Sequence, residues 1–212
     1  MIRVLIADDH AVVRRGVRMV LEDTARIEVV AEAATGAEAL DRARKERIDV
    51  AVLDLSMPGP GGLEVLRQLK EEHPHLPVLI LTMHPEDQYA VRAFRAGASG
   101  YLTKQSIPEE LIKAVETIAS GRRYITPSVA DALASEVHHD STKLPHEQLS
   151  DREYQVLLLI AAGKTVGEIA EQLRLSPKTV STYRARVLEK MQLNTSAELT
   201  HYAFSHKLVE CS

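Results

Sequence analysis

The chain has 212 residues, more than the roughly 100 to 150 of a usual single domain, so its length favours two modest domains. Hydrophobic residues make up 45% and charged residues 26%, and no apolar run approaches the roughly 20 residues that span a bilayer. An integral membrane protein is therefore excluded. The N-terminal apolar stretch is too short for a signal peptide, so we expect a cytoplasmic protein that binds no membrane. The single cysteine, Cys211, can form neither an internal disulfide nor a thiolate metal site.

The net charge of −4 is unevenly distributed along the chain. Residues 1–149 contain 18 basic and 23 acidic residues, whereas residues 150–212 contain 8 and 7. Residues 174–190 contain five basic residues and one acidic residue. A local cationic surface of this kind is what a DNA-binding element within an acidic protein requires.

The first 120 residues alternate short apolar runs with amphipathic stretches. The runs predict strands at Ile2–Ala7, Ile27–Ala33, Val50–Leu53, Val78–Leu81 and Gly100–Leu102. The stretches between and after them predict helices at Ala11–Asp23, Ala37–Arg47, Gly62–Glu72, Glu86–Ala96 and Pro108–Ser120. This (βα)5 pattern is typical of a doubly wound parallel sheet, for which we expect the strand order 2-1-3-4-5.

The alternation stops at Gly121, and we interpret residues 121–147 as a connection. A short helix can follow Thr126-Pro127 within it, while residues 138–148 are polar and unpatterned. His138 and His139 fit a solvated linker better than a metal site, since no thiolate or patterned carboxylate accompanies them. The expected domains are therefore residues 1–120 and residues 148–212.

The second domain is predicted to be a small all-α unit of four helices, at Asp151–Ala162, Val166–Leu173, Pro177–Met191 and Ser196–His206. Ser150 and Glu153 form a capping-box pattern at the first helix, and Ser176-Pro177 supplies the cap and first residue of the third. Two helices joined by a tight turn, the second rich in basic and hydroxyl residues, indicate a helix-turn-helix.

Five polar residues follow the ends of four predicted strands: Asp8, Asp9, Asp54, Thr82 and Lys104. Because ligands of open α/β sheets bind at the carboxyl ends of the strands, we expect these side chains to share one pocket. Three carboxylates placed together repel one another and favour a hard divalent cation, for which Mg²⁺ is the expected choice. A metal site follows from the pattern.

Asp54 is the expected nucleophile, because it is central in this pocket and aspartate can form acyl phosphates. Lys104 would offset the added charge, and the Thr82 hydroxyl could reach a phosphoryl oxygen. A single aspartate at a strand end is commonly a turn former, but the five residues together favour phosphoryl chemistry. A phosphohydrolase would carry Asp-x-Asp after the first strand and a cap insertion, so we expect no enzyme.

The first 120 residues resemble the receiver domain of two-component response regulators, which has a flavodoxin-like fold. The motifs that carry the resemblance are Asp8-Asp9, Asp54 with Met57-Pro58 and Gly61-Gly62, Thr82, and Tyr101-Leu102-Thr103-Lys104. The resemblance implies that Asp54 accepts a phosphoryl group from a histidine kinase. It also implies that Asp9 binds Mg²⁺ directly, that Asp8 helps through water and that the Ser56 carbonyl adds a ligand, with Asp54 among the metal-binding residues.

The same resemblance makes Thr82 and Tyr101 the paired switch residues and Lys104 the partner of the phosphoryl group. Taken by itself, Tyr101 is equally well explained as a packed aromatic residue.

On a helical wheel, residues 177–191 place Val180, Tyr183, Val187 and Met191 on one side. The short hydroxyl side chains and the alanine on the other side permit close approach to base edges, and the basic residues at its margins can reach phosphates. The candidate DNA-binding residues are Lys178, Thr179, Ser181, Thr182, Arg184, Ala185, Arg186 and Lys190. Taken alone, a charged helix of this kind is more often a solvated surface.

Residues 148–208 resemble the LuxR-type helix-turn-helix of the NarL/FixJ response regulators. The matching residues are Leu149-Ser150, Arg152-Glu153, Glu168-Ile169-Ala170, Leu173, Ser176 and Thr179-Val180-Ser181-Thr182. Val166-Gly167 and Tyr183 depart from the frequent family residues. The resemblance implies a transcription regulator that binds double-stranded promoter DNA, dimerises when phosphorylated and uses its last helix in the dimer. The alternative is a DNA-binding regulator that acts without phosphorylation.

Overall fold

The computed structural model describes residues 1–212 except 58–60, 107, 138–143, 207 and 210–212. Pro58 of the predicted receiver motif, His138 and His139 of the predicted linker, and Cys211 lie outside the described residues. The chain divides into two compact units, Met1–His138 and His139–Ser212.

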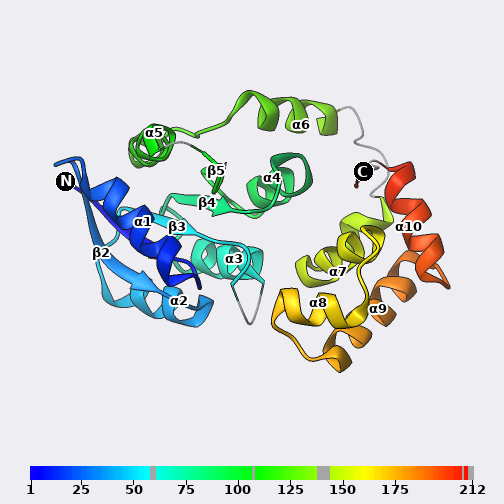
Figure 1. Ribbon diagram of the computed structural model, residues 1–212. Helices are drawn as coiled ribbons and strands as arrows, with labels where there is room; N and C mark the ends of the chain where they lie inside the picture. The colour runs from blue at the N-terminus through cyan, green and yellow to red at the C-terminus, as the bar shows by residue number, and fades with distance from the viewer. Residues whose placement is uncertain (58–60, 107, 138–143, 207, 210–212) are drawn as a thin grey trace. The chain divides into compact units, whose positions relative to one another are not determined.

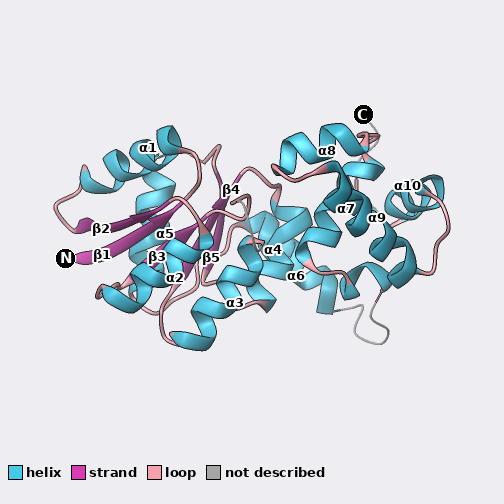
Figure 2. Cartoon of the chain, turned by 90° about the horizontal axis from the view of Figure 1, so that it is seen from below, coloured by secondary structure: helices cyan, strands magenta, loops and turns pink. Residues whose placement is uncertain are grey.

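The first unit contains a five-stranded parallel sheet with the order β2-β1-β3-β4-β5 (Figure 1). The strands are β1 Ile2–Ala7, β2 Ile27–Ala33, β3 Val50–Leu53, β4 Val78–Thr82 and β5 Gly100–Thr103. The predicted strand order is confirmed. Every residue of β3 and β4 is buried, as expected for central strands that are covered on both faces (Figure 2).

Helices cover both faces of this sheet. They are α1 Ala11–Glu22, α2 Gly36–Lys45, α3 Gly62–Glu72, α4 Glu86–Arg95 and α5 Pro108–Ala119. One core cluster joins α1 and α5 to alternate sheet residues such as Val4, Ile6, Val50 and Val52. Helices α2, α3 and α4 lie on the opposite face (Figure 1). The carboxyl ends of β1, β3, β4 and β5 are left free of this packing to carry a site.

The first unit extends beyond residue 120, although the sequence predicts a connection over residues 121–147. Tyr124 forms a parallel bridge with Gly100 of β5, and helix α6, Pro127–Val137, packs against α4. The hydroxyls of Thr126 and Ser128 donate to the Glu86 carboxylate at the start of α4, the first over 2.8 Å. These contacts join residues that are distant in the sequence. The end of the strand–helix alternation at residue 121 therefore gave no indication of them.

The second unit is helical. It contains the 3₁₀ turn η1 Pro145–Gln148 and the helices α7 Asp151–Ala161, α8 Val166–Leu173, α9 Pro177–Met191 and α10 Ser196–Ser205. Helix α9 packs against α7 and α8, and α10 packs against α7. Both predicted helix starts are confirmed: Ser150 forms a capping box with Glu153, and the Ser176 side chain caps α9. Among the described residues, none of the helices combines the length and apolarity needed to cross a membrane.

Gly62 begins α3 and lies against the backbone of the β3–α3 loop, so a substitution there measures how tightly that loop is packed. A Cβ there would lie 2.4 Å from Leu55 Cα and 2.7 Å from the Asp54 carbonyl oxygen, both backbone atoms. We therefore expect Gly62→Ala to lower the free energy of unfolding of the first unit by about 1 to 3 kcal/mol. Urea unfolding followed by circular dichroism measures this change.

Gly16→Ala is the matched control for this substitution. Gly16 lies inside α1, and apart from the adjoining backbone of that helix a Cβ there would meet no heavy atom within 4 Å. Alanine should raise stability by up to about 1 kcal/mol, because it favours the helix over the unfolded chain. Equal effects of the two substitutions would contradict the close packing beneath Asp54.

Candidate functional site

Three of the predicted pocket residues lie together at the carboxyl edge of the sheet. Asp8 follows β1, Asp54 follows β3, and Lys104 follows β5. The Lys104 Nζ atom lies 2.6 Å from Asp8 Oδ2 and 2.6 Å from Asp54 Oδ2. The side chains of Asp8, Asp54 and Lys104 are only 4%, 1% and 7% exposed. A buried ammonium therefore bridges two buried carboxylates from neighbouring strands.

The charge of Lys104 is set by opposing effects. Burial acts to lower the pKa of Lys104, but the carboxylates of Asp54 and Asp8 outweigh it and raise the pKa above its ordinary value. The ammonium therefore stays protonated and offsets part of the negative charge in the pocket.

Backbone donors orient the two buried carboxylates. The Ser56 N–H donates to Asp54 Oδ1 over 3.0 Å, and the His10 N–H donates to Asp8 Oδ1 over 2.8 Å. Each loop therefore turns back on the aspartate that ends its strand. Asp9 lies at the same edge, where the His10 Nδ1 atom is 2.8 Å from its Oδ1 atom.

The donor atoms of this edge suit a cation. One ligand atom from each of Asp8, Asp9, Asp54 and His10 can be chosen so that all lie within 4.8 Å of one another. Ligands on opposite sides of Mg²⁺, each about 2.1 Å from the ion, are about 4.2 Å apart. Three carboxylates at nearly this spacing fit a hard divalent cation in charge and in donor type.

Thr82 and Tyr101 are both fully buried, on β4 and β5. The Thr82 Oγ1 atom accepts from the His84 N–H at 3.5 Å, and its carbonyl accepts from the Lys104 N–H at 2.8 Å. The Tyr101 hydroxyl donates to the His84 carbonyl over 3.0 Å. Both side chains therefore contact the loop between β4 and α4, which adjoins the pocket.

The sequence pattern does not single out Arg14, and it places His84 only at the rim of the pocket. The Arg14 guanidinium donates to the Asp8 carbonyl over 2.7 Å, and the His84 Nε2 atom lies 3.3 Å from Ser56 Oγ. The His84 ring also stacks on Tyr89, with ring centroids 4.3 Å apart. The only sequence signal for Arg14 is its place in the first turn of the helix that follows the acidic pair.

The second predicted site lies on α9. Val180, Val187 and Met191 are buried and Tyr183 is half-buried, in agreement with the helical wheel. The opposite side is exposed and contains Lys178, Ser181, Thr182, Ala185 and Arg186. The hydroxyls of Ser181 and Thr182 donate to backbone carbonyls one turn earlier, over 2.9 and 3.0 Å. This side of α9 therefore combines small side chains with polar and cationic ones.

Two basic residues of α9 that we predict to contact DNA also make contacts inside the second unit. The Lys190 Nζ atom lies 2.6 Å from Glu153 Oε2, and Arg184 Nε donates to Ser196 Oγ over 2.9 Å. Glu153 is buried; burial acts to raise its pKa, but hydrogen bonds from Lys190 and Ser150 outweigh it and leave the pKa below its usual value. These two side chains tie α9 to α7 and α10.

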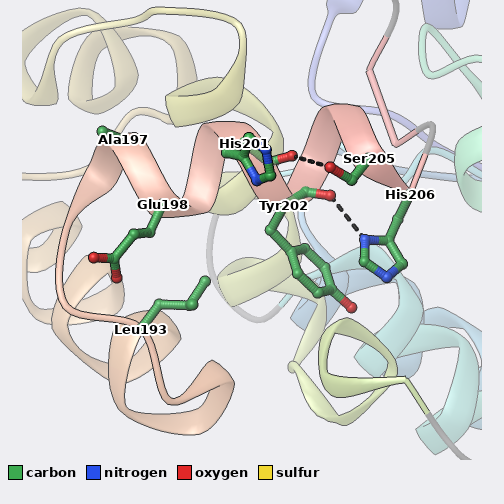
Figure 3. A pocket seen from close by; sticks show the side chains of 7 residues that line it. All are labelled: Leu193, Ala197, Glu198, His201, Tyr202, Ser205 and His206. Carbon is green, nitrogen blue, oxygen red and sulfur yellow. Dashed lines mark hydrogen bonds between the residues drawn. The ribbon is translucent and has the colours of Figure 1, made fainter.

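A hollow of about 580 Å³ lies along α10 (Figure 3). It is lined by Leu193, Ala197, Glu198, His201, Tyr202, Ser205 and His206. The Tyr202 and His206 rings stack with centroids 3.9 Å apart, and the Tyr202 hydroxyl lies 2.9 Å from His146 Nδ1. These contacts stabilise the last helix against the turn that precedes α7.

Two family models match the chain. One, described as the response regulator receiver domain, matches residues 4–116, and the other, described as bacterial regulatory proteins of the luxR family, matches residues 147–203. The response regulator UvrY of Escherichia coli strain K12 is 43% identical over 209 residues, which cover 98% of this chain and 96% of UvrY.

Solved structures of similar proteins include two of RcsB. RcsB from Salmonella enterica serovar Typhimurium, bound to the promoter rprA with the phosphomimetic BeF3⁻, is 29% identical, with a TM-score of 0.62 over 95% of this chain and 97% of that one. A structure of two RcsB dimers bound to two parallel DNAs is also 29% identical, with a TM-score of 0.59 over 96% of this chain and 98% of that one.

Proposed function

The chain belongs to the two-component response regulators that join a receiver domain to a luxR-family DNA-binding domain, and from this premise we propose that phosphorylation of Asp54 controls its binding to promoter DNA. The observation that carries the proposal is the buried ammonium of Lys104, 2.6 Å from carboxylate oxygens of both Asp54 and Asp8. This geometry supports Asp54 as the reactive carboxylate, with the ammonium of Lys104 as a fixed positive charge beside it.

The phosphoryl transfer follows from this arrangement. An Asp54 carboxylate oxygen attacks the phosphorus of a phosphohistidine on the kinase, the P–N bond breaks, and the histidine leaves with the electron pair. Lys104, whose pKa is raised, keeps its proton and pairs with the added negative charge. The reaction modifies the protein itself, so we assign no turnover of a separate substrate.

We assign the cation site to the same edge. Mg²⁺ held by Asp9, Asp54 and the Ser56 carbonyl, with Asp8 acting through water, would screen the charge that the carboxylates and the phosphoryl oxygens bring together. The spacing of the carboxylates supports this assignment. The Ser56 N–H already binds Asp54, so the loop is held close to the site.

The switch is assigned to Thr82 and Tyr101. In the proposal, the Thr82 hydroxyl leaves the His84 N–H and donates to a phosphoryl oxygen, which draws the β4–α4 loop toward Asp54. The Tyr101 hydroxyl binds the same loop through the His84 carbonyl, so movement of the loop changes the environment of Tyr101. Bistable side-chain contacts of this kind convert a local charge into a change of surface.

The DNA contacts are assigned to the exposed side of α9. Thr179, Ser181, Thr182 and Ala185 would face base edges in the major groove. We expect the phosphate contacts to come mainly from Lys178 and Arg186, with Arg184 and Lys190 restricted by their bonds to Ser196 and Glu153. Structures of RcsB bound to DNA, one with a phosphomimetic and one containing dimers, support DNA binding by this chain and a homodimer that forms on phosphorylation.

Under this proposal, residues 1–120 hold the phosphorylation site and residues 148–212 bind DNA, both in the cytoplasm. The segment 121–137 belongs structurally to the first unit, so the connection between the two functions begins after α6.

Genome-wide DNA occupancy, compared with and without phosphorylation in otherwise identical cells, tests the function. We expect promoter sites whose occupancy rises with phosphorylation. Equal occupancy at specific promoters in both states would contradict the switch and favour a phosphorylation-independent regulator. Loss of all specific occupancy would contradict the DNA-binding assignment itself.

Lys178→Ala should weaken binding to every DNA sequence. Lys178 is exposed at the start of α9, so its loss should reduce the slope of log affinity against log salt by about one unit. Fluorescence anisotropy with specific and random duplexes at several salt concentrations measures this slope.

Lys190→Ala is the matched control, because it removes a lysine from the same helix. We expect little change in its salt slope, but a loss of about 1 to 3 kcal/mol in stability of the second unit, since buried Glu153 loses its partner. A full unit of slope lost in Lys190→Ala, with stability unchanged, would restore Lys190 as a phosphate contact.

A further inference from the structure

Arg14, on the first turn of α1, connects two parts of the first unit that are distant in sequence. Its NH1 atom donates to the Asp8 carbonyl over 2.7 Å, and its Nε atom donates to Glu32 Oε2 over 3.3 Å. Glu32 belongs to β2, and the Arg14 side chain is only 17% exposed. The guanidinium therefore anchors the loop after β1 to the neighbouring strand.

Glu32 is held by a second arginine one turn further along α1. Arg18 NH1 lies 2.9 Å from Glu32 Oε1. The hydrogen bond from Arg18, together with Arg14, holds the pKa of Glu32 below its usual value despite partial burial. Glu32 is thus an ionised anchor shared by two arginines, of which Arg14 also donates to the acidic loop.

The carbonyl that Arg14 binds belongs to the peptide between Asp8 and Asp9. This peptide is planar, so fixing its carbonyl oxygen also fixes the nitrogen from which Asp9 continues. The Asp8 N–H is bonded to the Ala33 carbonyl over 3.1 Å, which holds the other side of the residue. Without Arg14, the Asp8 carbonyl would lose this donor, and the Asp8–Asp9 peptide and the Asp9 carboxylate that follows it would be less firmly held.

We propose that Arg14 is a positioning residue for the cation site: it orients the Asp8–Asp9 peptide and thereby sets the affinity for Mg²⁺. The inference rests on the proposed function, because it concerns the same site. Arg14 acts through the backbone and contacts neither the phosphoryl group nor the cation. Groups that orient metal ligands in this way typically change metal affinity by about 10- to 100-fold when they are removed.

The direction in which Mg²⁺ affinity changes when Arg14 is removed distinguishes a positioning role from a simple effect of its charge. Arg14 brings a positive charge near three carboxylates, so its loss by charge alone would strengthen Mg²⁺ binding. Positioning predicts the opposite, a weaker site. Arg18→Gln is the matched control, because it removes an equal charge from the same helix and the same glutamate.

The experiment uses the full chain and isothermal titration with Mg²⁺. We expect Arg14→Gln to raise the dissociation constant about tenfold or more, and Arg18→Gln to change it less than about twofold. With acetyl phosphate as donor, phosphorylation of Arg14→Gln should be slow at low Mg²⁺ and approach the wild-type rate at saturating Mg²⁺. A purely structural defect would lower the rate at every Mg²⁺ concentration.

Arg14→Lys provides a second variant, which keeps the positive charge but replaces the guanidinium that bonds the Asp8 carbonyl and Glu32 together. It should weaken Mg²⁺ binding in the same direction. Unchanged or tighter binding in Arg14→Gln, or in Arg14→Lys where Arg14→Gln fails to fold, would overturn the inference. The wild type distinguishes failure of the proposed function from failure of this inference. A wild-type chain that neither binds Mg²⁺ nor accepts phosphate contradicts the proposed function. A wild type that does both, with variants that behave like it, contradicts only the role of Arg14.

Discussion

Asp54→Asn is expected to abolish incorporation of phosphate from acetyl phosphate in the presence of Mg²⁺. The substitution preserves the size of the side chain but removes the carboxylate nucleophile, and the pocket holds Asp54 where its oxygens meet Lys104 and the Ser56 N–H. The wild type should carry one phosphate per chain that hydroxylamine removes, as expected of an acyl phosphate. Intact mass spectrometry before and after hydroxylamine measures both results.

Asp41→Asn is the control for this experiment. Asp41 is half-exposed on α2, where it pairs with Lys45, so its loss should leave phosphorylation unchanged. A hydroxylamine-labile phosphate that persists in Asp54→Asn would show that another carboxylate is the acceptor. Promoter binding by the Asp54→Asn protein should also no longer respond to acetyl phosphate.

Lys104→Met is expected to produce the largest loss of stability. It leaves the buried carboxylates of Asp8 and Asp54 without the ammonium that lies 2.6 Å from each, and breaking a buried pair in this way costs about 3 to 5 kcal/mol. Chemical unfolding of the first unit without Mg²⁺ measures the change. Lys113→Met, an exposed substitution on α5, should stay within about 0.5 kcal/mol of wild type.

The effect of Lys104 should also depend on pH. Because the folded pKa of Lys104 is raised above its unfolded value, its contribution is complete below the unfolded pKa of about 10.4 and is lost as pH rises through the folded pKa. The stability difference between wild type and Lys104→Met should therefore narrow above about pH 10.4. A difference that stays constant through this range would show that Lys104 stabilises the unit by packing rather than by charge.

The order and type of the strands and helices could be predicted because their signals are local. Four-residue apolar runs such as Val50–Leu53 and capping residues such as Ser150 and Ser176 define elements without reference to distant residues. The pocket residues could also be predicted, since a parallel sheet brings the ends of its strands to one edge wherever they occur in the chain.

By itself, then, the sequence determined the two-part architecture, the acidic edge with Asp54, and the exposed side of α9. Only the tertiary structure decided which long side chains join separate elements. Arg14 binds the Asp8 carbonyl, Glu86 accepts a hydrogen bond from Thr126 in the segment before α6, and Lys190 pairs with Glu153 of α7. The physical reason is the length and flexibility of these side chains. A flexible arginine, lysine or glutamate can contact any polar atom within several ångströms, and periodicity does not encode which atom the fold brings there.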